Sequence, residues 1–239
     1  MNKNLKTYLA VVYFICLSLV FYAFFTFLDF NELTNYSYIR EKSLFLIEFK
    51  NNHLFVFSFF FFLFTIAWVL MLGFGTPVAL VAGFIFGKFY GTVISVLGFA
   101  IGSTLLYFLA RVYIRQFIIK CLSEKISKFK GFFNKNEFLY FLLFRFAGGG
   151  GIPFPIQNVL PVIFDMKIKN YFYSTFLGLT PTIFIINSIG SGIEGIIDLQ
   201  ENPSFTDILL KSEIYLPLMG FIILLIISYL IKTKIFKIR

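Results

Sequence analysis

The longest stretches of this chain without a charged side chain limit its fold more than any other feature. Leu54–Gly87 is the longest, at 34 residues, whereas a helix needs about 20 apolar residues to span a bilayer. Of the 239 residues, 59% are hydrophobic and 14% are charged, compared with about 25% charged in soluble domains. We therefore predict an all-α polytopic membrane protein. This composition excludes a soluble enzyme and a nucleic-acid-binding protein.

Four other uncharged stretches predict about four transmembrane helices: Tyr8–Leu28, Phe89–Ala110, Asn170–Ile193 and Ile214–Ile231. The first lacks a small-residue cleavage site, so we interpret it as a retained helix rather than a signal peptide. We divide the chain into three parts. Residues 1–53 hold the N-terminal helix and an outer interfacial segment, and residues 54–195 form the main membrane domain. Residues 196–239 hold an acidic outer loop, the C-terminal helix and a basic tail.

Two stretches are interrupted by Gly and Pro, and we predict that each forms a re-entrant helical hairpin. The first hairpin covers 54–88 and breaks at Gly73–Pro77, and the second covers 138–166 and breaks at Gly148–Pro153. Broken backbone is tolerated at membrane depth only where it is buried in protein or lines a water-filled cavity. Single transmembrane helices, 89–110 and 170–192, follow the two hairpins.

The flanking charges predict how these segments cross the membrane. Segment 111–137 carries seven Lys/Arg and two Glu, and 194–213 carries one Lys and five acidic residues. The positive-inside rule places 111–137 and both termini in the cytoplasm and 194–213 outside. Each hairpin must then return to the side it left, which predicts an inverted repeat with two opposed hairpins in the inner (plasma) membrane. The 112–136 segment predicts a basic amphipathic helix on the inner leaflet or a solvated loop helix.

Few residues of this chain could carry catalytic chemistry. One His and two distant Cys offer no metal cluster, and we expect no enzyme activity and no cofactor. The hairpin tips remain. Thr76 and Pro77 predict the N-cap and first turn of one returning arm, and Pro153 and Pro155 begin the other. Opposed helix N-termini would make an anion-binding site.

Arg145 lies just before the second tip, and an intramembrane cation is by default a functional residue. No carboxylate lies deep in either hairpin, so the partner of Arg145 could be a ligand phosphate. Alternatively, Arg145 reaches the inner interface or binds backbone carbonyls. Asn158 and Gln157 are expected to bind the broken backbone, and Asn158 is also a candidate substrate-binding residue. Five glycines are predicted to allow close helix packing: Gly83, Gly87, Gly98, Gly102 and Gly178.

These residues resemble a known family. Thr76-Pro77, Ala82–Gly87 and Ala110-Arg111, followed by Phe144–Phe146, Pro153–Pro155 and Asn158, resemble the VTT domain of the SNARE-associated Golgi protein family, in the DedA superfamily. The resemblance covers roughly 54–195. It implies two opposed re-entrant hairpins and movement of lipids between leaflets, because eukaryotic members are similar to phospholipid scramblases and bacterial members to flippases for a polyprenyl-phosphate carrier.

The chain departs from the family pattern at several positions. Ala147 and Gly148 stand where a Pro is usual, and Val162 stands where a Gly is usual. The first hairpin has no acidic residue, and Asp165 lies only at the exit of the second, which argues against proton coupling.

We therefore expect a scramblase or flippase whose partners are anionic or phosphate-headgroup lipids, with a homo-oligomer left open. The alternatives are a membrane scaffold or assembly factor without transport activity, and a small-anion transporter.

Overall fold

The computed structural model describes residues 36–113, 115–116, 126–199 and 212–235, together with four isolated residues between 15 and 26. Within these residues all regular structure is helical, which confirms the all-α prediction. Most of the predicted N-terminal helix Tyr8–Leu28 lies outside them, as do 117–125 of the predicted basic helix and 200–211 of the predicted outer loop.

The chain divides into two units, at Asn51. Within the first unit, α2 (Tyr36–Asn52) occupies the segment predicted to be interfacial. The second unit holds the two hairpins and the long helices, and the site lies entirely within it.

The first hairpin consists of α3 (Leu54–Leu70) and α4 (Gly75–Phe86), and the break between them covers residues 71–74, slightly before the predicted Gly73–Pro77. Its two ends lie together, because the Tyr90 hydroxyl donates a hydrogen bond of 3.2 Å to Ser58 Oγ. The rings of Phe57 and Phe86 are also 5.4 Å apart. The segment therefore returns to the level at which it started.

The second hairpin consists of α8 (Glu137–Phe146), the glycine turn η2 (Gly148–Gly151), α9 (Phe154–Val159) and η3 (Leu160–Phe164). Its two ends also lie together. The Glu137 carboxylate accepts hydrogen bonds from the Lys167 backbone N–H at 3.2 Å and from Asn170 Nδ2 at 2.7 Å. We call the place where the arms of a hairpin begin and end its base.

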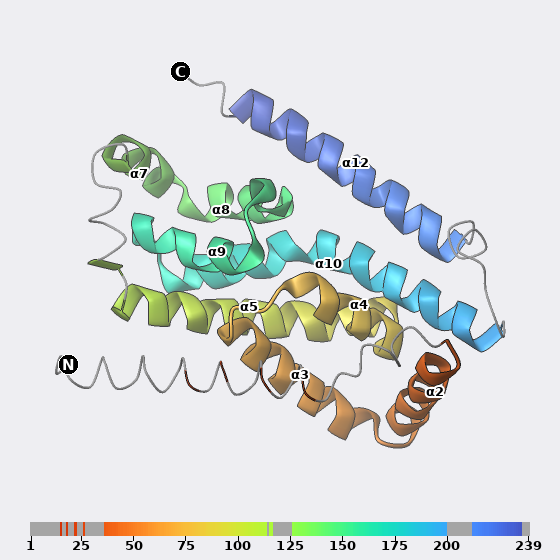
Figure 1. The fold of residues 1–239 in the computed structure, drawn as a ribbon. Helices are drawn as coiled ribbons and strands as arrows, with labels where there is room; N and C mark the ends of the chain where they lie inside the picture. Colours follow the sequence, from red (N-terminus) through yellow and green to blue (C-terminus); the bar gives the residue numbers. More distant parts are fainter. Residues whose placement is uncertain are drawn as a thin grey trace. The chain divides into compact units, whose positions relative to one another are not determined.

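Two long helices, α5 (Lys88–Tyr113) and α10 (Ile168–Leu199), run beside each other through this unit (Figure 1). Both are long and apolar enough to cross a membrane, and a third span is counted if Glu41–Asn52 and Leu54–Leu70 are taken as one. The predicted count of about four stays a prediction. Helix α10 is longer than predicted, and α12 (Ser212–Ile235) packs against it and covers the predicted C-terminal helix. A short helix, α7 (Ile126–Lys135), precedes the second hairpin.

The two hairpins approach α5 from opposite ends. Tyr90, near its start, contacts the base of the first hairpin, whereas Tyr107, near its end, donates a hydrogen bond to the Met166 carbonyl at the base of the second. Phe99 lies between them, and its ring is 5.7 Å from that of Phe154 at the second tip. A Cβ atom on Gly75, at the first tip, would lie 3.7 Å from the same Phe99 ring. The tips therefore meet near the middle of α5.

Glycines allow the helices to approach closely. A Cβ atom on Gly83 of α4 would collide with the backbone of Asn187 on α10, and one on Gly98 of α5 would lie 2.8 Å from Thr65 on α3. Gly102 meets Val69 in the same way. Gly87 differs from the prediction, because it has open space around it and a φ of 77°. It ends α4 and turns the chain into α5 rather than packing against a neighbour.

Large apolar side chains cover the outside of this unit. Phe55 on α3 is 85% exposed and Phe89 on α5 is 70% exposed. A soluble protein rarely presents contiguous apolar surface of this kind, whereas lipid-facing helices require it. The exposed faces therefore agree with a location in the membrane.

Candidate functional site

A cavity of about 350 Å³ lies between the two hairpin tips. The first tip contributes Phe74, Gly75 and Thr76, and α10 closes one side with residues that include Thr182 and Ile186. The second hairpin contributes the largest share of the lining: Arg145, Phe146, Ala147, Gly148, Gly151, Ile152, Phe154 and Gln157. One cavity thus brings together segments that are about seventy residues apart in the sequence.

At the first tip, the prediction that Thr76 is the N-cap is wrong, whereas Pro77 does lie in the first turn of the helix as predicted. Helix α4 begins at Gly75 with Phe74 as its N-cap, and no side chain caps it. Thr76 and Pro77 are the second and third helical residues, and both are exposed. Helix α4 starts earlier than predicted because Trp68 Nε1 donates a 2.9 Å hydrogen bond to the Phe74 carbonyl, which holds Phe74 in an extended conformation directly before the helix. Thr76 still lines the cavity.

At the second tip, four consecutive glycines adopt left-handed backbone conformations. The φ angles of Gly148–Gly151 lie between 63° and 83°, a region that side chains with a Cβ atom strongly disfavour. The Gln157 side chain fills the inside of this turn. Its Nε2 donates hydrogen bonds to the carbonyls of Ile152 at 2.6 Å and Gly148 at 3.3 Å. Gln157 therefore holds the turn in shape.

The returning arm of the second hairpin is divided into two short helices, α9 and η3. Pro153 is the N-cap of α9 and Pro155 is its second residue, so both prolines begin the arm, but α9 has only six residues. Pro161 lacks a backbone N–H, and the chain continues as the 3₁₀ turn η3. An anion site formed by the opposed helix N-termini stays a prediction. The positive charge at this tip is that of Arg145.

Arg145 is completely buried, and neutral groups surround its guanidinium. Its Nη2 donates hydrogen bonds to Asn158 Oδ1 at 2.6 Å and to the Tyr171 hydroxyl at 3.0 Å. Its Nη1 donates one to Gln157 Oε1 at 3.1 Å. The rings of Phe141, Phe154 and Tyr171 also lie within 6 Å, at 4.9, 5.4 and 5.9 Å. The predicted alternative of an arginine that reaches the interface is therefore wrong.

The charge of Arg145 is not compensated within the part of the chain that the structure describes. Asp165, the acidic residue at the exit of the second hairpin, pairs with Arg111 and Arg115 rather than with Arg145. The Nε–H group of Arg145 and the Nδ2 group of Asn158 are buried and have no hydrogen-bond partner. A cation that has no negatively charged partner and one unused donor, and that lies beside a cavity, is suited to binding an anion.

Gly178 on α10 allows this arrangement. A Cβ atom there would lie 2.6 Å from Arg145 Cβ and 2.9 Å from the Leu142 carbonyl oxygen. The predicted packing role of Gly178 thus has a specific purpose, because it lets α8 bring Arg145 within reach of Tyr171.

Comparison with known proteins identifies the family of this chain. The VTT domain matches residues 72–192, from the first tip to α10. This chain belongs to the VTT domain family. It is 31% identical over 120 residues to YqeD of Bacillus subtilis (strain 168), covering 48% of this chain and 57% of YqeD. It is 23% identical over 176 residues to the transmembrane protein 41 homolog of Caenorhabditis elegans, covering 71% of this chain and 68% of that protein. No solved structure matches the chain.

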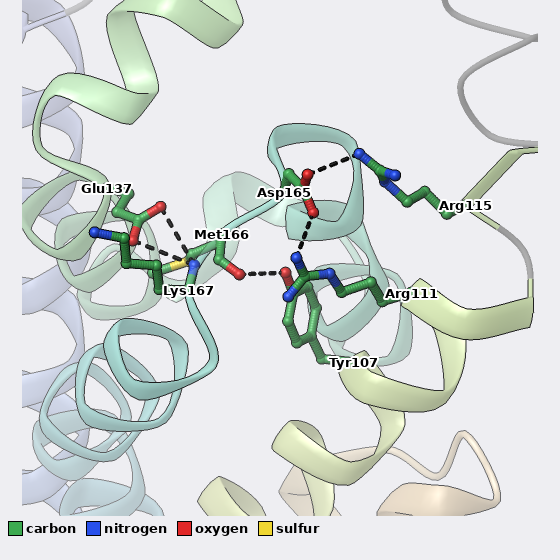
Figure 2. A network of polar contacts seen from close by, with 7 residues as sticks. All are labelled: Tyr107, Arg111, Arg115, Glu137, Asp165, Met166 and Lys167. Carbon is green, nitrogen blue, oxygen red and sulfur yellow. Dashed lines mark hydrogen bonds and ion pairs between the residues drawn. The ribbon is translucent and has the colours of Figure 1, made fainter.

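The VTT domain contains a second cluster of polar residues, at the base of the second hairpin (Figure 2). The Asp165 carboxylate pairs with Arg111 Nη2 at 2.8 Å and with Arg115 Nη2 at 2.7 Å. The next two residues are held as well, Met166 by Tyr107 and Lys167 by Glu137. These contacts fix the end of the returning arm to the start of α8 and to the end of α5 and the residues that follow it.

Sequence reasoning missed several residues of the VTT domain that the structure brings to Arg145. Tyr171 lies 26 residues after Arg145, in an uncharged stretch where nothing marks it as a partner. Phe141 and Phe154 are two of 37 phenylalanines, so their identity alone carries no signal. The family resemblance does include Phe154, and the spacing of Phe141 and Arg145, four residues apart on one helix, could have indicated their contact.

Proposed function

We propose that this protein moves phosphate-headgroup lipids between the leaflets of the bacterial inner membrane, as a scramblase or flippase, with both termini in the cytoplasm. The observation that supports this function best is the uncompensated, buried Arg145 beside a cavity that both hairpin tips line. A headgroup phosphate would pass between the tips while its acyl chains stay in the surrounding lipid.

The membrane location rests on coarser evidence that agrees with it. The family match, the two helices long enough to span and the exposed apolar faces all support a membrane protein. The interaction with a phosphate follows from chemistry, because a guanidinium binds phosphate oxygens through a planar fork of donors. The hydrogen bonds of Arg145 to neutral groups could be exchanged for such oxygens without separating a salt bridge.

A lipid-scrambling assay tests this function. Purified full-length protein in liposomes containing fluorescent phosphatidylglycerol should make the inner-leaflet probe accessible to an impermeant quencher. Arg145→Lys keeps the charge but loses the fork, so it should retain partial activity. Arg145→Gln should lose most activity per folded molecule. Arg145→Lys should insert as wild type does, because the charge is kept. Arg145→Gln should also insert, because removing a cation from membrane depth eases insertion.

Lys88→Gln is the matched control, because it removes an exposed cation away from the cavity and should leave scrambling unchanged. Full activity of Arg145→Gln would exclude the phosphate-binding role. Wild-type protein that leaves the lipid distribution unaltered would favour a scaffold instead, and uptake of labelled phosphate without lipid movement would favour a small-anion transporter.

A further inference from the structure

The arginine pair at the base of the second hairpin is far better supplied with donors than with acceptors. Arg111 lies in the last turn of α5 (Lys88–Tyr113), and Arg115 follows four residues later, beyond the end of this helix. Both contact the single carboxylate of Asp165, which leaves the cluster with a net positive charge (Figure 2). All three side chains are between 31% and 39% exposed, so an anion that is not part of the protein could reach them.

The carboxylate satisfies this pair incompletely. A carboxylate has two oxygens, and here each one contacts a different guanidinium through a single nitrogen. The Nε–H group of Arg115 is buried and has no acceptor. The contact of Asp165 Oδ1 with Arg111 is a charge contact at 2.8 Å that lacks hydrogen-bond alignment. A phosphate carries more oxygens than a carboxylate, so it could bridge both guanidiniums and also accept from Arg115 Nε.

The backbone conformation of Asp165 also affects how its carboxylate meets the arginines. Its φ is 61° and its ψ is 37°, a left-handed conformation that costs a residue with a Cβ atom about 1 kcal/mol. The carboxylate is therefore presented to the arginines from a left-handed turn, a conformation that Asp and Asn adopt more readily than other residues with a Cβ atom.

We propose that Arg111 and Arg115 form a binding site for the phosphate of an anionic phospholipid headgroup, in which Asp165 occupies the place of the phosphate until a lipid displaces it. The site lies at the base of the hairpin rather than at the tip, and it requires no transport. The positive-inside rule places this end of α5 at the inner leaflet, where anionic headgroups are abundant.

Binding of short-chain lipid to the purified full-length protein tests this site. Dihexanoylphosphatidylglycerol would be titrated in detergent, with binding measured by native mass spectrometry or calorimetry. Asp165→Asn should bind several-fold more tightly than wild type, because the competing carboxylate is gone. Asparagine also tolerates the left-handed conformation, so the turn should persist. Arg111→Gln with Arg115→Gln should weaken binding by roughly tenfold or more.

Asp165→Asn should raise the affinity for lipid and the double arginine variant should lower it. These opposite effects distinguish a binding site from a structural clasp, by which we mean ion pairs that only stabilise the fold. In a clasp, both variants would lower stability and neither would raise lipid affinity, so unchanged or weaker binding by Asp165→Asn overturns the proposal. Glu137→Gln is the matched control, because it removes a negative charge at the same base but from a carboxylate that binds backbone and amide N–H groups. It should leave the affinity for lipid unchanged.

Two further measurements complete the test. If the double arginine variant does not fold, Arg115→Gln alone should give an intermediate loss of affinity, and an unchanged affinity would overturn the site. Inorganic phosphate should compete poorly with the lipid, because it lacks the apolar contacts of the acyl chains. Equal competition by inorganic phosphate would overturn the lipid assignment and leave a free-anion site.

Discussion

At the scale of single residues, the environment of Arg145 departs furthest from what an ordinary membrane domain tolerates. A charged side chain inside a bilayer costs several kcal/mol unless other groups solvate it. Here three neutral acceptors and three aromatic rings replace water, and no carboxylate neutralises the charge within the described part of the chain. The electrostatic potential beside the cavity therefore stays positive, which an ion pair would have prevented.

Alanine substitutions in the glycine turn should distinguish backbone strain from steric exclusion. Gly150→Ala has open space and meets only the cost of a positive φ, about 1–2 kcal/mol of unfolding free energy. Gly149→Ala carries the same strain and also collides with the Gln157 amide, whose displacement breaks its bonds to Arg145 and Ile152. We expect an additional loss of about 1–3 kcal/mol. Unfolding by denaturant in detergent would measure the unfolding free energy of both variants. Equal losses of stability would contradict the role of Gln157 in filling the inside of the glycine turn.

The sequence predicted the buried charge but not the groups that surround it. The position of Arg145 just before a Gly/Pro break in an uncharged stretch was enough to place it in the membrane interior. Its acceptors follow 12, 13 and 26 residues later, and which of them reach it depends on the left-handed turn between. Backbone handedness at a run of four glycines is not encoded by any local propensity, because glycine adopts either hand.

At the scale of secondary-structure elements, the packing of both hairpins on α10 depends on glycines at the contact points. Gly83 of α4 lies against the Asn187 backbone, and Gly190 of α10 lies against the Leu80 carbonyl of α4. Two reciprocal close approaches of this kind fix both the distance and the register of a helix pair. The glycine spacing in the sequence indicated such packing, but it did not reveal which helices meet.

Replacing these glycines should affect stability according to the space that each has. Gly83→Ala places a methyl group into the α10 backbone, so α4 must move away, and we expect a loss of about 2–4 kcal/mol. Gly220→Ala on α12 is the matched control, because its Cβ would meet Ile185 at 3.7 Å, an ordinary contact. Thermal unfolding in detergent should show a lowered midpoint for Gly83→Ala only. A similar shift for both variants would contradict the close α4–α10 crossing.

The approximate positions of both breaks were predictable at this scale, whereas the division of the second returning arm was not. Gly148–Pro153 contains the turn of the second hairpin, whereas the turn of the first covers residues 71–74 and shares only Gly73 and Phe74 with the predicted Gly73–Pro77. Pro153 and Pro155 were predicted to begin the second arm, but its division was not predicted: α9 has six residues, and the chain continues as η3, which contains Pro161. Within the first break, the hydrogen bond from the Trp68 indole to the Phe74 carbonyl sets where α4 starts, and it depends on a fold-back that residue pattern does not encode.

At the scale of the whole second unit, the two bases lie at opposite ends of α5 and the tips meet near its middle. A lipid headgroup that crosses here would pass between the two tips at mid-depth. Above and below that point, one hairpin would lie beside its path. The predicted crossing pattern requires the same geometry, since each hairpin must return to its own side.

Labelling from one side of the membrane tests this arrangement. In a background with Cys16 and Cys121 replaced by serine, Lys88→Cys lies at the first base and Lys169→Cys near the second, and both positions are exposed. An impermeant thiol reagent added outside intact cells should label the first and not the second, and permeabilised cells should show both labelled. Labelling of both, or of neither, in intact cells would place the bases on one side.

The order in which the partners of Arg145 occur along the chain has a consequence for biosynthesis. Gln157, Asn158 and Tyr171 all follow the arginine, and Tyr171 belongs to the next long helix. While the ribosome is still making the glycine turn, α8 therefore carries a cation with none of its eventual acceptors. We expect α8 to wait in the aqueous vestibule of the insertion machinery until α10 emerges, so that the second hairpin and α10 enter the bilayer as one cooperative unit.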